Sequence, residues 1–143
     1  MSLKYVIHKH QATHLHWDLR LEHNGILKSW AIPKEPSDDP KVKRLAIEAE
    51  DHEIDYAKFE GTIPKGEYGA GKVKIWDSGS YEPIKFGKDS IEINIHGKKL
   101  KGIYHLFRFP ARGGSLPVRQ AGAFGGKKAG PKNWLFFKSK EKA

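Results

Sequence analysis

The residues of this chain that could carry out metal or phosphate chemistry are concentrated in one short run near the N-terminus. Residues 14–21 read His-Leu-His-Trp-Asp-Leu-Arg-Leu, so polar and large apolar side chains alternate strictly. Because successive side chains of a β-strand point to opposite faces, this run predicts a strand with one apolar and one reactive face. The reactive face would carry His14, His16, Asp18 and Arg20, a set suited to a divalent metal that holds a phosphate.

A third imidazole can join this set. His10 precedes His16 by six residues, and residues 11–13 would form a short connection between two strands. A hairpin there would bring His10, His16 and Asp18 together as a two-histidine, one-carboxylate metal set, which leaves coordination positions open for water and substrate. The alternative imidazoles are those of His8 and His14.

Positive side chains could add a phosphate clamp. Arg20 follows Asp18 on the same predicted face, where its planar guanidinium could hold phosphate oxygens or simply pair with Asp18 or Glu22. Lys34 and Arg44 flank predicted strands and could contribute further positive charge to the pocket.

His52 and Tyr56 form the other candidate pair. Four residues apart, they would share one face of a helical turn, where His52 could protonate a departing oxygen and Tyr56 could orient the phosphate. A capping pair would have the same spacing. A non-haem iron oxygenase site, built from His16 and Asp18 with His52 or His96, is an alternative, but Arg20 and the basic composition favour a phosphate substrate.

Composition limits the fold and the class of function. With 143 residues, 38% of them hydrophobic, the chain can form one core but is too short for two, so we expect a single domain over residues 1–143. The sequence has no apolar run typical of a membrane span or secretory signal, which favours a soluble, cytoplasmic protein. The absence of cysteine excludes disulfides and thiolate metal sites and leaves histidine and carboxylate as the strong ligands.

The net charge of +9 favours a polyanionic partner such as nucleic acid. The positive charge is segregated, because acidic residues concentrate over residues 35–67 and basic ones over 85–101 and 108–142. Residues 113–132 are rich in Gly, Lys and Arg, and we interpret them as a mobile basic loop within the domain, with a plain linker as the alternative. The candidate nucleic-acid-binding residues are Arg108, Arg112, Arg119, Lys127 and Lys128.

The elements that must position these groups are mostly strands. Runs bounded by turn residues predict strands at 5–9, 15–22, 26–32, 44–50, 71–76, 90–96, 102–109 and 134–138, the spacing of an all-β, mainly antiparallel barrel or sandwich. Turns are predicted at 23–25, 77–79 and 97–99. Short flanking helices are predicted at 37–42, after a Ser/Asp cap, and at 54–59. The glycine-rich stretch 61–71 is interpreted as a shaped loop, with a phosphate cradle as the alternative.

Linked motifs extend this pattern to a known family. Residues 9–22 (Lys-His-x-Ala-x-His-Leu-His-Trp-Asp-Leu-Arg-Leu-Glu) and 25–34 (Gly-x-Leu-Lys-Ser-Trp-Ala-Ile-Pro-Lys) closely resemble the 3′-phosphoesterase domain of bacterial and archaeal DNA ligase D. The resemblance continues at 43–46, 50–64, 66–71 and 76–77, and returns at 132–135. It therefore covers nearly the whole chain.

The resemblance implies a β-barrel with short flanking helices and a manganese-dependent enzyme of DNA repair by non-homologous end joining. Such an enzyme removes a terminal ribonucleotide from a 3′ end and then hydrolyses the resulting 3′-phosphate to a hydroxyl. Co²⁺ and Zn²⁺ are alternative metals. The implied partners are DNA or RNA-tipped primer-template ends, a separate ATP-dependent ligase and end-joining factors, all in a prokaryotic cytoplasm near the nucleoid.

The resemblance also implies roles for particular residues. The metal ligands would be His10, His16 and Asp18. Residues around the scissile phosphate would be Arg20, Arg44, His52 and Tyr56, and supporting positions would be His8, His14 and Lys34.

The sequence departs from the family pattern at two points. Position 8 is His where the family usually has Gln, which could add a ligand or tune the surroundings of the metal. The chain also starts close to the first predicted strand, so we expect it to lack the N-terminal arm of some family members and to hydrolyse phosphomonoesters more readily than diesters. A non-catalytic DNA-end-binding module that recruits a ligase is the alternative function.

Overall fold

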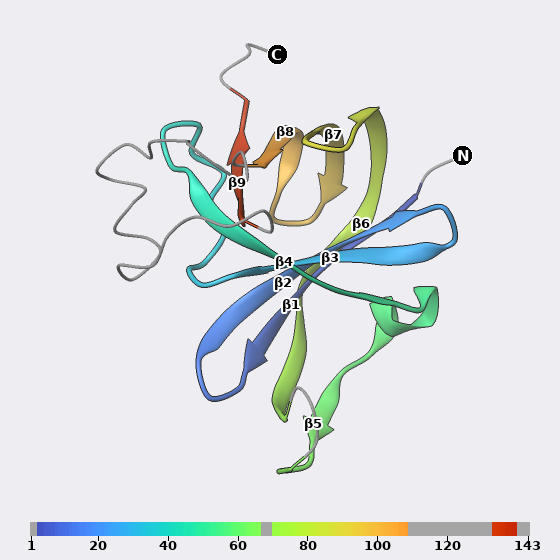
Figure 1. The fold of residues 1–143 in the computed structure, drawn as a ribbon, viewed down its shortest axis with the longest axis vertical. Coiled ribbons are helices and arrows are strands. Elements are labelled where there is room, and N and C mark those ends of the chain that lie inside the picture. The colour runs from blue at the N-terminus through green and yellow to red at the C-terminus, as the bar shows by residue number, and fades with distance from the viewer. Residues whose placement is uncertain (1–2, 67–69, 109–132, 140–143) are drawn as a thin grey trace.

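The computed structural model describes residues 3–66, 70–108 and 133–139, and these residues are almost entirely in β-structure (Figure 1). A single 3₁₀ helix, η1, lies within this part of the chain at Ile54–Lys58. The strands of the described residues are β1 (Leu3–Gln11), β2 (Leu15–His23), β3 (Ile26–Ile32), β4 (Arg44–His52), β5 (Gly61–Ile63), β6 (Gly71–Phe86), β7 (Ser90–Gly97), β8 (Lys101–Arg108) and β9 (Asn133–Lys138).

Eight of these strands close into an antiparallel barrel. The order around the barrel is β1-β2-β3-β4-β9-β8-β7-β6, and pairing of β6 with β1 completes the ring. The short strand β5 pairs with β6 outside this ring, and both β5 and η1 lie to one side of the barrel (Figure 1). The predicted all-β antiparallel fold is confirmed. None of the helical structure in the described residues is long and apolar enough to cross a membrane.

The barrel interior is the hydrophobic core. Along β2 the apolar side chains of Trp17, Leu19 and Leu21 are buried there, as the alternation predicted. Trp30 of β3 meets Trp134 of β9 edge to face, with ring centroids 5.7 Å apart. The last strand in the sequence, β9, therefore packs against β3 from the N-terminal part of the chain. Since the core fills the interior, the reactive residues of β1 and β2 lie on the outer side of the sheet.

The hairpin between β2 and β3 turns at the predicted asparagine-glycine pair. Asn24 has φ 52° and Gly25 has φ 83°, the left-handed conformations that this tight turn requires. This turn fixes the register in which Arg20 lies opposite Ser29, and thereby sets the neighbours of the reactive face.

The predicted turn at residues 77–79 is wrong, because β6 continues through it to Phe86. The buried Asp77 carboxylate accepts hydrogen bonds from the Tyr5 hydroxyl (2.8 Å) and from the backbone N–H groups of residues 98–100 (2.8–3.0 Å). Gly79 lets β7 approach closely, since a Cβ there would collide with the carbonyl oxygen of His96. Tertiary contacts thus hold turn-forming residues in an extended strand.

The predicted helix at residues 37–42 does not form either. The Ser37 hydroxyl accepts the N–H of Asp39 (3.1 Å), and the Asp39 carboxylate accepts the N–H of Lys41 (2.9 Å). These side chains satisfy the backbone locally, as Ser and Asp often do outside helices, and Pro40 disfavours helical geometry at the preceding residue. The helical turn predicted at 54–59 is confirmed as η1, and residues 61–63, interpreted as loop, form β5.

Candidate metal centre and phosphate site

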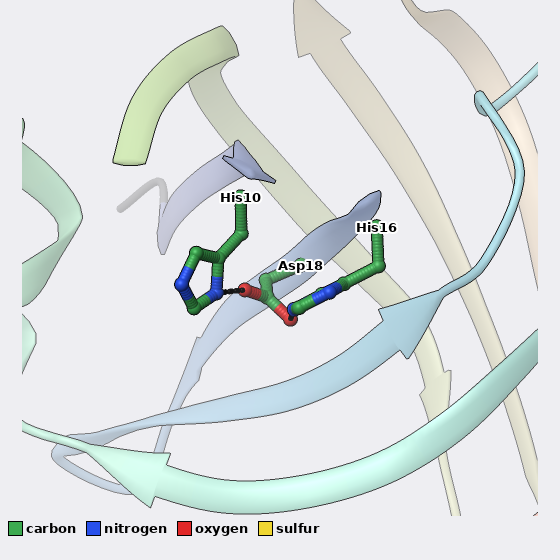
Figure 2. A group of neighbouring side chains, drawn as sticks. All are labelled: His10, His16 and Asp18. Carbon is green, nitrogen blue, oxygen red and sulfur yellow. Dashed lines mark ion pairs between the residues drawn. The ribbon is translucent and has the colours of Figure 1, made fainter. Parts of the chain in front are cut away.

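Two histidines and one carboxylate meet where β1 and β2 pair. His10 lies directly opposite His16 in the register, and Asp18 follows two residues later on β2. Asp18 Oδ2 is 3.5 Å from His10 Nδ1, and Asp18 Oδ1 is 3.3 Å from His16 Nε2. Figure 2 shows the three side chains pointing toward one another. One potential ligand atom from each residue lies within 4.8 Å of the others, so the predicted set is assembled in the structure.

Hydrogen bonds fix the orientation of these groups. His16 Nδ1 lies 2.9 Å from the carbonyl oxygen of His14 and donates to it, and Nε2 is directed at Asp18. Burial would lower the pKa of His16, but the hydrogen bond to Asp18 and its charge raise this pKa above its ordinary value, so a metal at Nε2 would displace a proton. Burial would raise the pKa of Asp18, but hydrogen bonds from His10 and His16 and the charge of Arg20 outweigh burial and hold this pKa far below its usual range. The carboxylate is therefore ionised and available as a ligand.

His14 itself does not share the reactive face. It lies in the bend before β2, and its side chain is exposed. Its contribution to the site is the backbone carbonyl that orients His16. The alternating pattern grouped its imidazole with the strand face, but β2 begins at Leu15, as predicted, and His14 lies in the bend that precedes it.

Arg20 is buried beside the metal set and held on several sides. Its Nη2 donates to Asp18 Oδ2 (3.3 Å), its Nε to His8 Nδ1 (3.0 Å) and its Nη1 to Ser29 Oγ (2.8 Å). The Tyr56 ring lies against the guanidinium, 4.8 Å from Cζ to the ring centroid. Arg20, which is 4% exposed, thus holds its positive charge in a fixed place next to the ionised carboxylate of Asp18.

His8 has both ring nitrogens engaged and lies outside the cluster of candidate ligands found in the described residues. An arginine Nε can only donate, so His8 Nδ1 accepts from Arg20, and His8 Nε2 donates to the carbonyl oxygen of Phe59 (3.0 Å). Burial and the charge of Arg20 lower the pKa of His8 to about 4, which keeps this ring neutral. His8 thereby links β1 to the segment after η1.

Helix η1 covers this site with aromatic rings. His52, at the end of β4, stacks on Tyr56 (centroids 4.3 Å apart), and Tyr56 stacks on Phe59 (5.0 Å). Burial, followed by the charge of Arg20, lowers the pKa of His52. The structure thus stacks His52 on Tyr56, whose ring lies against Arg20, and a pocket beside η1 is lined by both His52 and Tyr56.

The structure describes three further predicted positive residues: Arg44, Lys34 and Arg108. Arg44 donates from Nε to the carbonyl oxygen of Glu35 (2.7 Å) and lines a different pocket together with Trp76 and Lys99. Lys34 is exposed just after β3. Arg108 pairs with Asp89, with 2.6 Å between Nη2 and Oδ1. Outside the described residues are the remaining nucleic-acid-binding candidates, Arg112, Arg119, Lys127 and Lys128, and the basic loop predicted at 113–132.

Sequence reasoning missed two participants. Ser29 is buried and pairs with Arg20 across β2 and β3, a position that the hairpin register could have indicated. Phe59 contributes its backbone carbonyl to His8, and a backbone group leaves no residue-type signal in the sequence.

Two imidazole nitrogens and one carboxylate oxygen suit a first-row divalent ion and leave its remaining positions to water and substrate. An arginine fixed next to such an ion suits an anionic substrate. Fold and site together define a closed antiparallel barrel with a candidate metal and phosphate site on its outer surface, covered by an aromatic helical turn.

Comparison with known proteins identifies the family. Residues 8–108 match the family described as the DNA Ligase D 3'-phosphoesterase domain, and the chain belongs to this family. The multifunctional non-homologous end joining protein LigD of Pseudomonas aeruginosa is 50% identical over 116 residues, covering 78% of this chain and 14% of the relative. LigD of Mycobacterium bovis is 51% identical over 108 residues, 73% of this chain and 14% of the relative. LigD of Mycolicibacterium smegmatis is 47% identical over 116 residues, 73% of this chain and 15% of the relative. The chain thus spans about one seventh of the length of these relatives.

Proposed function

We propose that this chain is a metal-dependent phosphoesterase that heals DNA 3′ ends for repair by end joining. It removes a 3′-phosphate to leave a hydroxyl that a ligase can use. In a separate diesterase reaction it removes a 3′-terminal ribonucleoside, which leaves a 3′-phosphate for the first reaction. The observation that carries the proposal is the joined arrangement of His10, His16 and Asp18 next to the buried Arg20, within a chain of this family.

The donor set fits Mn²⁺, with Co²⁺ and Zn²⁺ as alternatives, because it combines imidazole and carboxylate ligands and contains no thiolate. His10, His16 and Asp18 would hold the ion. When bound, it would supply Lewis-acid stabilisation of the negative charge that builds on the phosphate.

The protein's own groups supply the remaining electrostatics. Arg20, held by His8, Ser29 and Asp18, presents a fixed positive charge that needs no reorganisation as the phosphate reacts. A phosphate beside His52 would favour its protonated form, which can donate a proton to the leaving oxygen. Tyr56 keeps the His52 ring in place by stacking.

Arg44 and Lys34 would add positive charge around the scissile phosphate, Arg44 from the pocket that it lines and Lys34 as a supporting group. Arg108 would bind the nucleic acid from the surface. The proposed partners are DNA or RNA-tipped DNA 3′ ends, a ligase and other end-joining factors.

A panel of metals and substrates tests the proposal. 5′-labelled primer-templates ending in a 3′-phosphate or a single 3′-ribonucleotide are incubated with EDTA, Mg²⁺, Mn²⁺, Co²⁺ or Zn²⁺ and resolved on a denaturing gel. We expect Mn²⁺ to support conversion of the phosphate end to hydroxyl, and the Asp18→Asn variant to lose it. Asp89→Asn, the same change at a residue whose side chain is 61% exposed, is the matched control. Normal DNA binding without turnover in any metal would contradict the proposal and favour the end-binding module.

A further inference from the structure

An aromatic cluster lies on the outer surface of the barrel, away from the metal set. It consists of His105 and Phe107 on β8 and Phe137 on β9, and we call these three residues the aromatic platform. The ring centroids are 5.4 Å apart for His105 and Phe137 and 5.8 Å apart for the other two pairs. Phe107 is 46% exposed, which is unusual for a phenylalanine in the middle of a regular sheet.

The strand pattern explains why these rings face outward. Tyr104, Leu106 and Phe136 alternate with the platform residues and are buried in the core, so the platform rings occupy the opposite face of the same strands. The core is complete without them. Leu135 lies opposite Phe107 in the register and Ile47 of β4 is also exposed, so the apolar surface continues across β9.

Positive charge borders the platform. The Lys43 ammonium lies over the Phe137 ring, with Nζ 4.8 Å from the centroid. The acidic neighbour, Glu92, lies 4.0 Å from the imidazole of His105. The chain as a whole carries a net charge of +9. Lysine is depleted from the centres of protein–protein interfaces, whereas aromatic rings combined with basic side chains are typical of surfaces that bind single-stranded nucleic acid.

We propose that the aromatic platform binds unpaired DNA, with a base stacked on the exposed Phe107 ring and a phosphate near Lys43, which lies over Phe137. Stacking on exposed rings is tolerant of sequence because every base offers a π face. The platform would therefore hold a strand of any sequence.

The strand order separates this surface from the metal set. β9 and β8 lie across the barrel from β1 and β2, with β3 and β4 between them on one side and β6 and β7 on the other. The inference rests on the proposed function for its biological context. The unpaired strand would be an overhang or a displaced strand, and it would belong to the same DNA molecule whose 3′ end is processed. DNA binding by the platform itself requires no catalysis.

The test measures binding in EDTA, so that turnover does not enter. Fluorescently labelled duplexes with blunt ends, and the same duplexes with a twelve-nucleotide oligo(dT) tail, are titrated with the full chain. We expect the tail to raise the affinity of the wild-type protein. Phe107→Ala and Phe107→Leu should each weaken binding of the tailed duplex about fivefold or more and leave blunt-end binding unchanged, because both remove one stacking surface. Phe107→Trp should retain tight binding.

Ile84→Ala is the matched control, since Ile84 is 54% exposed and lies outside the platform. Thermal melting of each variant checks its fold, and Phe107→Leu keeps an apolar side chain of similar size. Equal affinity of the wild type, Phe107→Ala and Phe107→Leu for the tailed duplex would overturn the inference. So would an equal loss for blunt and tailed duplexes. Loss of tail binding together with normal removal of a 3′-phosphate from a blunt duplex supports the platform, whereas absence of phosphatase activity in the wild type refutes only the proposed function.

Discussion

Replacing Asp18 with asparagine should destabilise the metal-free protein strongly. The substitution preserves the shape of the side chain but removes its negative charge. Asp18 Oδ2 lies 3.3 Å from Arg20 Nη2, and the two side chains are 7% and 5% exposed. Removing one partner of a buried ion pair typically costs about 3–5 kcal/mol, because the other charge stays buried without compensation. We expect a loss of this size in the free energy of unfolding.

Urea unfolding in EDTA, followed by tryptophan fluorescence, measures this loss. With a urea dependence of roughly 1–3 kcal/mol per molar, the midpoint should fall by about 1 M or more. Asp89→Asn makes the same chemical change in the exposed ion pair with Arg108, where the expected loss is at most about 1 kcal/mol. Equal midpoints for the two variants would refute the argument that burial makes the Asp18 charge essential.

The same variant tests the metal assignment. A ligand that binds only the folded state raises its stability in proportion to the logarithm of ligand concentration. Mn²⁺ should therefore raise the melting temperature of the wild type and of Asp89→Asn, but not that of Asp18→Asn. A comparable rise in Asp18→Asn would remove Asp18 from the ligand set.

Three further outcomes follow from other parts of the structure. His8→Gln should leave the Mn²⁺ affinity measured by titration unchanged, because glutamine can accept from Arg20 and donate to the Phe59 carbonyl. His10→Gln should lower this affinity. An equal loss of affinity in the two variants would mean that His8 is a ligand. Asp77→Asn should lower the free energy of unfolding by about 2–4 kcal/mol in urea titrations, because an amide nitrogen replaces an oxygen that accepts buried donors. Raising the pH above about 10 should destabilise the protein, since burial raises the folded-state pKa of several tyrosines above the unfolded value and the unfolded chain then releases protons first. The tyrosines concerned are Tyr5, Tyr81 and Tyr104. Unfolding that coincides with the rise of tyrosinate absorbance would confirm this pH dependence. A constant free energy of unfolding from about pH 9 to 11 would contradict it.

The metal set was predictable because every relation within it is local. His16 and Asp18 share a strand face by the two-residue period, and a short connection places His10 opposite His16. The polar and apolar alternation begins one residue before the strand, so the pattern grouped His14 with the reactive face although it lies in the preceding bend. The sequence pattern therefore grouped the candidate ligands but could not identify every side chain around them.

Long-range contacts account for most of what the sequence did not reveal. Residues 77–79 have turn-forming types, yet donors from the β7–β8 turn converge on Asp77 and keep β6 extended. The hydrogen bond from Arg44 to the Glu35 carbonyl joins residues nine positions apart, and a backbone acceptor leaves no residue-type signal in the sequence. The aromatic platform depends on β8 pairing with β9, and the intervening chain gives no sign of that register.

The charge of the assembled site favours one of the two proposed reactions. Asp18 contributes −1 and Arg20 +1, and the low pKa of His8 leaves that ring neutral, so these groups sum to zero. A divalent ion, which must be counted with the site it occupies, would bring the sum to +2, and the protonated His52 of the proposed reaction would raise it to +3. A terminal phosphate monoester carries about −1.5 to −2 at neutral pH, whereas a phosphodiester carries a single negative charge. The site is therefore better matched to a 3′-phosphate than to the internal diester of a ribonucleotide-tipped end. Inorganic phosphate should accordingly compete with the 3′-phosphate substrate more strongly than dimethyl phosphate does, and equal competition by the two anions would refute this charge matching.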